Sequence, residues 1–196
     1  MANQSYCTID VFDYVDEEEN VEEYGKRLYI DVSRLADDIK SELEKSKSVL
    51  KVNTLIYDTP LHDNGRPNLT LTNNLISYAE SCITDHDILI SHWREDHHQD
   101  HRVCYDVARS IARKHFEQFW CMDEPPYNLH YKNFNCNQYV DITGYTEEKR
   151  KALQSYKTYF NSDSIETILN YNRYRGSFLG AGKLAETFQI MYNKIS

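Results

Sequence analysis

Residues 87–101 read DILISHWREDHHQDH, and this stretch decides the fold that we predict. Residues 87–91 form a short apolar run with an acidic start, which is typical of a buried strand. A histidine-rich loop follows over 92–101, and residues 102–119 then repeat apolar side chains at helical spacing. The order strand, loop and helix predicts one repeat of an α/β sheet. The loop then lies at the carboxyl end of the strand, where such sheets bind ligands.

The same alternation continues on both sides of this stretch. Short apolar or alternating runs predict strands at 6–12, 52–57 and 139–143. Apolar side chains at helical spacing predict helices at 32–50, 71–83, 145–160 and 181–195. Prolines and glycines predict loops at 58–70 and 121–138. This order predicts an α/β fold with a Rossmann-like, mostly parallel sheet and flanking helices, in a single domain over residues 1–196.

Composition narrows the classes of partner. The chain of 196 residues has a formal net charge of −9, which disfavours binding to a phosphate backbone, so we expect no nucleic-acid partner. No run approaches the ~20 apolar residues that span a bilayer, and residues 1–6 lack the features of a signal peptide. Five cysteines without a C-x-x-C pair suggest reduced thiols rather than a disulfide framework. We therefore expect a cytoplasmic protein without a membrane span.

The loop between the central strand and helix carries the chemistry. Residues 91–101 contain four histidines and two aspartates. Imidazole is the commonest metal-ligating side chain, and carboxylates orient it or bind beside it. His98 and His101 are three residues apart where the loop meets the helix, and Asp100 is expected to cap that helix. From composition alone, a solvated polar loop is the alternative reading.

Four segments occur in an order that is informative when they are taken together. They read SHWREDHHQDHR (91–102), FNCNQYVDIT (134–143), EKRKALQSY (148–156) and RGSFLGAGKLAETF (175–188). This set, within about residues 41–192, resembles the zinc-dependent N-deacetylases of the PIG-L or LmbE-like family. The first segment is similar to the second signature of that family, which follows a strand of the sheet.

The resemblance implies a zinc-dependent hydrolase that removes acetyl groups from N-acetylated amino sugars. It implies that His101 is a zinc ligand and that His98 is the histidine that stabilises an oxyanion. Asp100 matches the aspartate that orients a histidine. Asp96 is expected to contact substrate or to lie behind the metal ligands. His92 and His97 match no functional position of the motif, so each is expected to be a loop histidine or to lie behind the ligands.

One departure from the family concerns the metal site. The family's first signature, A-H-P-D-D-E, does not occur, and no histidine precedes His62. Either residues 13–18 (DYVDEE) are an eroded form of it, or the chain lacks the family's first strand and begins at the second. The second alignment is favoured, because strand 6–12 is followed by an acidic loop and then by helix 32–50. The domain is then N-terminally truncated or divergent.

The missing signature predicts an incomplete, weak zinc site, because a catalytic zinc normally has three protein ligands. Asp13, Asp16 and Asp58 are candidate substitute ligands, and a complementing chain or a second copy is a candidate partner. The leading function is deacetylation of an N-acetylated sugar, weak or absent in the isolated chain. The alternatives are a non-catalytic binding or assembly protein and a hydrolase of another N-acyl substrate. Bound zinc and released acetate distinguish the enzyme from the binding protein.

Overall fold

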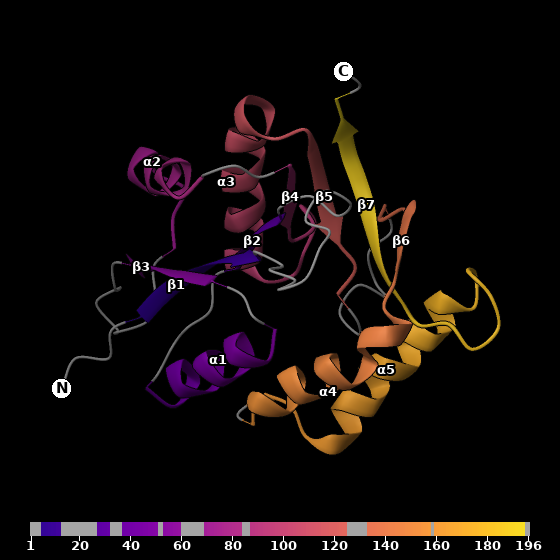
Figure 1. Cartoon of the computed structure of the whole chain (residues 1–196). Coiled ribbons are helices and arrows are strands. Elements are labelled where there is room, and N and C mark those ends of the chain that lie inside the picture. Colours follow the sequence, from indigo (N-terminus) through magenta and orange to yellow (C-terminus); the bar gives the residue numbers. More distant parts are fainter. Residues whose placement is uncertain are drawn as a thin grey trace, which may run out of the picture. The chain divides into compact units, whose positions relative to one another are not determined.

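The computed structural model describes residues 5–12, 27–31, 37–50, 53–59, 69–83, 87–124, 133–157 and 159–194. Side chains are described for residues 41–50, 69–83 and the ranges that follow them. The chain divides into two units, which are drawn together in Figure 1. The first unit contains residues 1–36, 51–121 and 190–196, and the second contains residues 37–50 and 122–189.

The first unit is built on strands in the order β3-β1-β2-β4-β5. These strands are β1 (Ser5–Phe12), β2 (Arg27–Asp31), β3 (Asn53–Thr59), β4 (Ile88–Ser91) and β5 (Gln118–Met122). β1 runs antiparallel to both β2 and β3, whereas β2, β4 and β5 are parallel. In the register of the last pair, Ser91 lies opposite Cys121, so the carboxyl ends of β4 and β5 coincide.

Burial explains why β4 and the helix after it form. All four residues of β4 are buried, as expected of a parallel strand that is covered on both faces. Helix α3 (Gln99–His115) buries Cys104, Val107, Ala108 and Ile111, which recur at intervals of three to four along one face. Helix α2 (Asn73–Ser81) lies beside α3 (Figure 1).

The second unit combines helices with an antiparallel pair of strands that are far apart in the sequence. Its elements are α1 (Asp37–Leu50), β6 (Gln138–Asp141), the 3₁₀ turn η2 (Thr143–Tyr145), α4 (Thr146–Ser155), α5 (Ser162–Gly176) and β7 (Ala185–Asn193). β6 and β7 are antiparallel, α1 packs against α4, and α4 packs against α5. The last four residues of β7 belong to the first unit. α5 begins with a capping box between Asn161 and Ser164, which satisfies backbone N–H groups at its first turn.

The predicted α/β class is confirmed, but the sheet is only partly parallel. Among the described strands, β1 opposes both its neighbours and β6 opposes β7, so the prediction of a mostly parallel sheet was wrong for these pairs. A parallel pair needs a crossover connection, usually a helix, whereas an antiparallel pair does not.

Several predicted elements were also wrong in their bounds or type. The helix predicted over 102–119 ends at His115, and β5 begins within its predicted last turns. The predicted loop 121–138 contains the last residues of β5. The strand β2 and the helix α5 were not predicted. The helix predicted over 145–160 is shorter, at 146–155. The helix predicted over 32–50 agrees with α1 over 37–50, and residues 32–36 lie outside the described ranges.

The largest correction concerns the C-terminal segment, because residues 181–195 were predicted to be a helix and 185–193 form β7. Leu184, Phe188 and Met191 have helical spacing, but the segment is rich in Thr, Phe, Ile and Tyr, which favour strands. Gly180 and Gly182, which lie shortly before β7, have φ values of 151° and 79°, and both values are outside the helical range. The antiparallel ladder with β6 then decides the outcome. None of the described helices is long and apolar enough to cross a bilayer.

Candidate metal centre

The loop from β4 to α3 brings two histidine rings face to face. His92 directly follows β4 and is only 1% exposed. His101 lies in the first turn of α3. The centroids of the two rings are 3.8 Å apart and their planes differ by 10°, so the imidazoles are stacked. A strand end and a helix start, both in the first unit, thus hold these two rings together.

Asp96 fixes the conformation of the loop and the orientation of His101. Its side chain is buried, and its Oδ1 accepts a hydrogen bond from the backbone N–H of His98 at 2.7 Å. Its Oδ2 lies 2.9 Å from His101 Nδ1, and since a carboxylate only accepts, the ring donates from Nδ1. The guanidinium of Arg102 donates to the backbone oxygens of Asp96 and His97, at 2.7 and 3.0 Å. The nitrogen of His101 suited to binding a metal is then Nε2, across the ring from Asp96.

His98, rather than Asp100, is the N-cap of α3. Its Nδ1 accepts a hydrogen bond from the backbone N–H of Asp100 at 3.2 Å, so the prediction that Asp100 caps the helix was wrong. Asp100 lies in the first turn, where its charge complements the helix dipole. Because His98 Nδ1 accepts a hydrogen bond, it carries no proton in this arrangement, and the ring proton lies on Nε2. The 4.0 Å contact between Nδ1 and Asp100 Oδ2 is therefore not an ion pair.

The residues of the first unit that could hold a metal ion are His92, Asp96 and His101, whose ligand atoms all lie within 4.8 Å of one another. Ligand bonds of about 2.0 Å at tetrahedral angles place donor atoms about 3.3 Å apart, so small side-chain rotations would close such a set around one ion. Imidazole and carboxylate donors suit zinc and other divalent transition metals. The donor set therefore fits a metal of this class.

The structure brings Asp96, His98 and His101 together, and the ring centroids of His98 and His101 are 4.6 Å apart. His92 was expected to be a loop histidine or to lie behind the ligands, but its ring belongs to the group that could hold a metal ion. The signal for His92 in the sequence was its position directly after a buried strand.

The candidate substitute ligands remain untested. Asp13 and Asp16 lie outside the described residues, and so does the side chain of Asp58. Asp58 was expected to follow a strand, but it lies within β3. β3 and β2 are both antiparallel to β1, so β3 runs in the same direction as β4.

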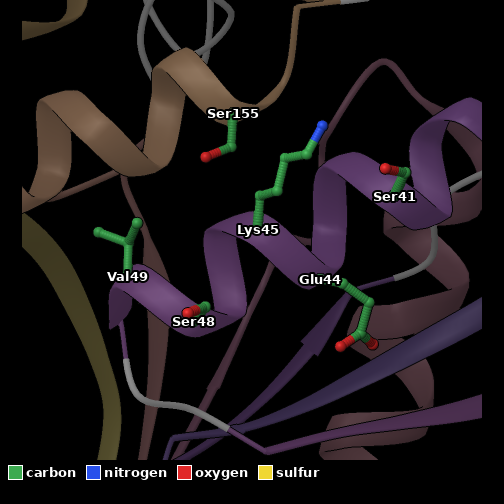
Figure 2. A pocket seen from close by; sticks show the side chains of 6 residues that line it. All are labelled: Ser41, Glu44, Lys45, Ser48, Val49 and Ser155. Atoms are coloured by element: carbon green, nitrogen blue, oxygen red, sulfur yellow. The ribbon is translucent and has the colours of Figure 1, made fainter.

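A separate groove occurs in the second unit between α1 and α4 (Figure 2). It is lined by Ser41, Glu44, Lys45, Ser48, Val49 and Ser155. These side chains include no histidine or cysteine, and one carboxylate beside one ammonium group does not make a metal site. The groove therefore offers no alternative to the loop after β4.

Comparison with known proteins supports the fold. No family model and no curated protein matches the chain. The solved structures include the conserved protein TT1542 from Thermus thermophilus, with 17% identity, a TM-score of 0.57, and coverage of 83% of this chain and 76% of that one. They also include GalB, the 4-carboxy-2-hydroxymuconate hydratase from Pseudomonas putida, with 13% identity, a TM-score of 0.58, and coverage of 82% and 73%. At such identities the likeness is one of fold. Fold and donor set together define an α/β protein with a candidate metal centre.

Proposed function

We propose that this chain is a zinc-dependent hydrolase of the PIG-L/LmbE type that removes acetyl groups from N-acetylated amino sugars. Residues 1–196 would form one such domain, a divergent Rossmann-like form. The observation that carries the proposal is the Asp96–His101 pair, which lies after β4 with His92 stacked against it. The ordered resemblance of four sequence segments supports it, and so does the shared fold with a hydratase.

The residues divide between holding the metal and orienting its ligands. His92 and His101 are the proposed ligands, and Asp96 is proposed to orient His101 through the Nδ1 hydrogen bond of 2.9 Å. Zinc, when bound, supplies a Lewis acid that polarises an acyl carbonyl and lowers the pKa of a nearby water molecule. The carboxylate of Asp96 holds the ring of His101 in one orientation, which keeps the ligand nitrogen in place.

His98 is proposed to stabilise the negative charge that develops on the carbonyl oxygen. Its side chain is 56% exposed, so it is accessible to a substrate. Its Nδ1 is occupied by the backbone N–H of Asp100, which leaves the Nε2–H as a hydrogen-bond donor. Asp100 is proposed to keep the ring of His98 in this tautomer and orientation. The four described free cysteines, among them Cys104 and Cys121, support our proposal of a reducing, cytoplasmic environment.

The alternative is a non-catalytic binding protein with the same fold, and the missing A-H-P-D-D-E signature favours it. The two functions differ in whether acetate is released. A binding protein would hold an N-acetylated sugar, with or without zinc, and leave its amide bond intact.

The test combines metal analysis with an assay for acetate released from N-acetylglucosamine derivatives. Wild type, His101→Ala and His97→Ala are purified in the same way and loaded with one equivalent of zinc. His97 is exposed in the same loop but lies outside the donor set, so its variant is a matched control. We expect wild type and His97→Ala to retain zinc and to release acetate slowly, and His101→Ala to lose both properties. Zinc retention without acetate release would favour the binding protein, and equal zinc retention by all three would refute the metal centre.

A further inference from the structure

Arg94 places a positive charge beside the candidate metal centre. It follows His92 by two residues in the loop after β4, and its side chain is 51% exposed. Its guanidinium lies 5.3 Å from the centroid of the Trp93 ring, which is buried. A guanidinium over an aromatic ring forms a cation–π contact. The buried ring therefore gives this half-exposed cation a preferred position.

Two buried side chains of the first unit lie within the electric field of Arg94. Burial raises the pKa of the Cys121 thiol, and the charge of Arg94 acts against that rise. Burial also raises the pKa of Tyr105, and Arg94 is among the cations that act against it. Cys121 lies opposite Ser91 at the carboxyl ends of β5 and β4, and Tyr105 is one helical turn after His101 on α3. Arg94 therefore lies near both the strand ends and the helix that border the candidate centre.

The guanidinium of Arg94 is weakly engaged by its neighbours. It pairs at 3.2 Å with the carboxylate of Glu95, which is also exposed. Such exposed pairs contribute little and exchange readily for other partners. Arg102 differs, because it donates to the backbone oxygens of Asp96 and His97 and so holds the loop. Of the two arginines in residues 91–102, Arg94 is thus the one available to a ligand.

The chemistry of a guanidinium indicates the kind of ligand. Its planar set of N–H groups matches the oxygens of a carboxylate or a phosphate and binds them through two parallel hydrogen bonds. The chain as a whole has a net charge of −9, which repels anions in general. A cation at the edge of the candidate centre gives an anionic ligand a local attraction that the rest of the surface does not.

We propose that Arg94 is a specificity-determining residue that binds a phosphate or carboxylate group of the substrate. The inference rests on the proposed function and narrows its substrate class to N-acetylated amino sugars that carry such an anionic group. Arg94 is not among the proposed metal ligands, so its contribution to binding is measurable with and without zinc.

The test measures the dissociation constants of three amino sugars by isothermal titration calorimetry. They are glucosamine, glucosamine 6-phosphate, and muramic acid, which carries a carboxylate. Wild type is titrated once with one equivalent of zinc and once in EDTA. We expect at least one anionic sugar to bind about tenfold more tightly than glucosamine under both conditions, because charge-assisted hydrogen bonds are the strong ones. The comparison of the two anionic sugars distinguishes phosphate from carboxylate.

Three variants of the loop assign the preference to Arg94. Arg94→Gln is expected to bind the three sugars within about twofold of one another, and Arg94→Lys to keep part of the preference, because it retains the charge without the planar geometry. Glu95→Gln removes the competing carboxylate, so its preference for the anionic sugar is expected to rise about two- to threefold. A purely structural role of Arg94 does not predict this rise.

The matched control is Arg113→Gln, since Arg113 is an exposed arginine in the last turn of α3, at the end of that helix away from His101. We expect it to keep the wild-type preference. No preference in wild type, a preference that Arg94→Gln keeps, or one that appears only with zinc would overturn the role of Arg94. The proposed deacetylase fails in a different way: wild type would bind the anionic sugar as expected but release no acetate from its N-acetylated form.

Discussion

At the scale of single residues, Asp96 makes two contacts that depend on its carboxylate. One oxygen fixes the backbone of the loop at His98, and the other orients the ring of His101. In Asp96→Asn the amide nitrogen replaces one of these acceptor oxygens, so one of the two hydrogen bonds is lost. We expect zinc affinity to fall by about 10–100-fold, as measured by competition titration.

The control for this change is Glu95→Gln, since Glu95 neighbours Asp96 but has an exposed carboxylate that pairs with Arg94. Its zinc affinity is expected to stay within about twofold of wild type, in keeping with the small contribution of exposed ion pairs. An unchanged zinc affinity in Asp96→Asn would contradict the proposal that this carboxylate orients His101.

Cys136 provides a second residue-scale prediction, on thiol reactivity. Its pKa is raised from 9.0 to about 11, first by burial and then by the Asp123 charge, so about a hundredfold less thiolate is present than for an ordinary thiol near pH 8. We expect iodoacetamide to modify Cys136 at least tenfold more slowly in the native protein than in urea, with the native rate rising up to about pH 11. Peptide mass spectrometry of timed samples measures this, and equal rates in the two states would contradict it.

At the scale of elements, the end of α5 depends on a close backbone approach. A Cβ atom added to Gly176 would lie 2.1 Å from the backbone oxygen of Lys183, well inside contact distance. We expect Gly176→Ala to destabilise the protein by about 3 kcal/mol, or to prevent folding, since neither backbone can move alone. Urea unfolding followed by circular dichroism measures the change.

Gly144→Ala is the matched control, because an added Cβ there meets nothing within 4 Å. Its free energy of unfolding should lie within about 0.5 kcal/mol of wild type. Equal urea midpoints for the two variants would contradict the close packing of α5 against the segment before β7.

Local sequence pattern was sufficient for some elements and not for others. β4 and the existence of α3 were predictable, because continuous apolar residues and helical spacing can be recognised in their own sequences. The start of α3 was not, since the helix was predicted from residue 102 and begins at Gln99. β7 was not, because its apolar residues fit either period and its pairing with β6 is a tertiary contact. α5 was missed because Asn172 interrupts its apolar stripe, although Asn172 is buried and donates to the backbone oxygen of Ala185.

The residues of the candidate site could likewise be predicted from the sequence only in part. His98 and His101 were predictable as a pair from their spacing at a strand–helix junction, and Asp96 from its place in the motif. The stacking of His92 on His101 was not, because it depends on how the loop between them folds back.

At the scale of the whole molecule, a metal centre links zinc concentration to stability. An ion that binds only the folded chain stabilises it by about 2.7 kcal/mol at a hundredfold excess over its dissociation constant. For a chain of 196 residues this corresponds to a rise in Tm of about 5–10 °C. Differential scanning fluorimetry with zinc and then with EDTA measures the rise and its reversal.

His101→Ala should lose this thermal response, and His97→Ala should keep it. Wild type without any response to zinc would speak against a metal bound in the folded state. A rise that persists in His101→Ala would place the metal elsewhere in the chain.

The placement of α1 in the second unit has a consequence for biosynthesis. α1 spans residues 37–50, yet it packs against α4, at 146–155, and its unit ends with residue 189. Loop-closure entropy disfavours such distant contacts, and translation at about 5–20 residues per second separates the two helices by several seconds. Helix α1 therefore lacks its partner until residues 146–155 have been made, and a chaperone on the ribosome would meet it unpaired. The second unit completes its folding only after residue 189 has been synthesised.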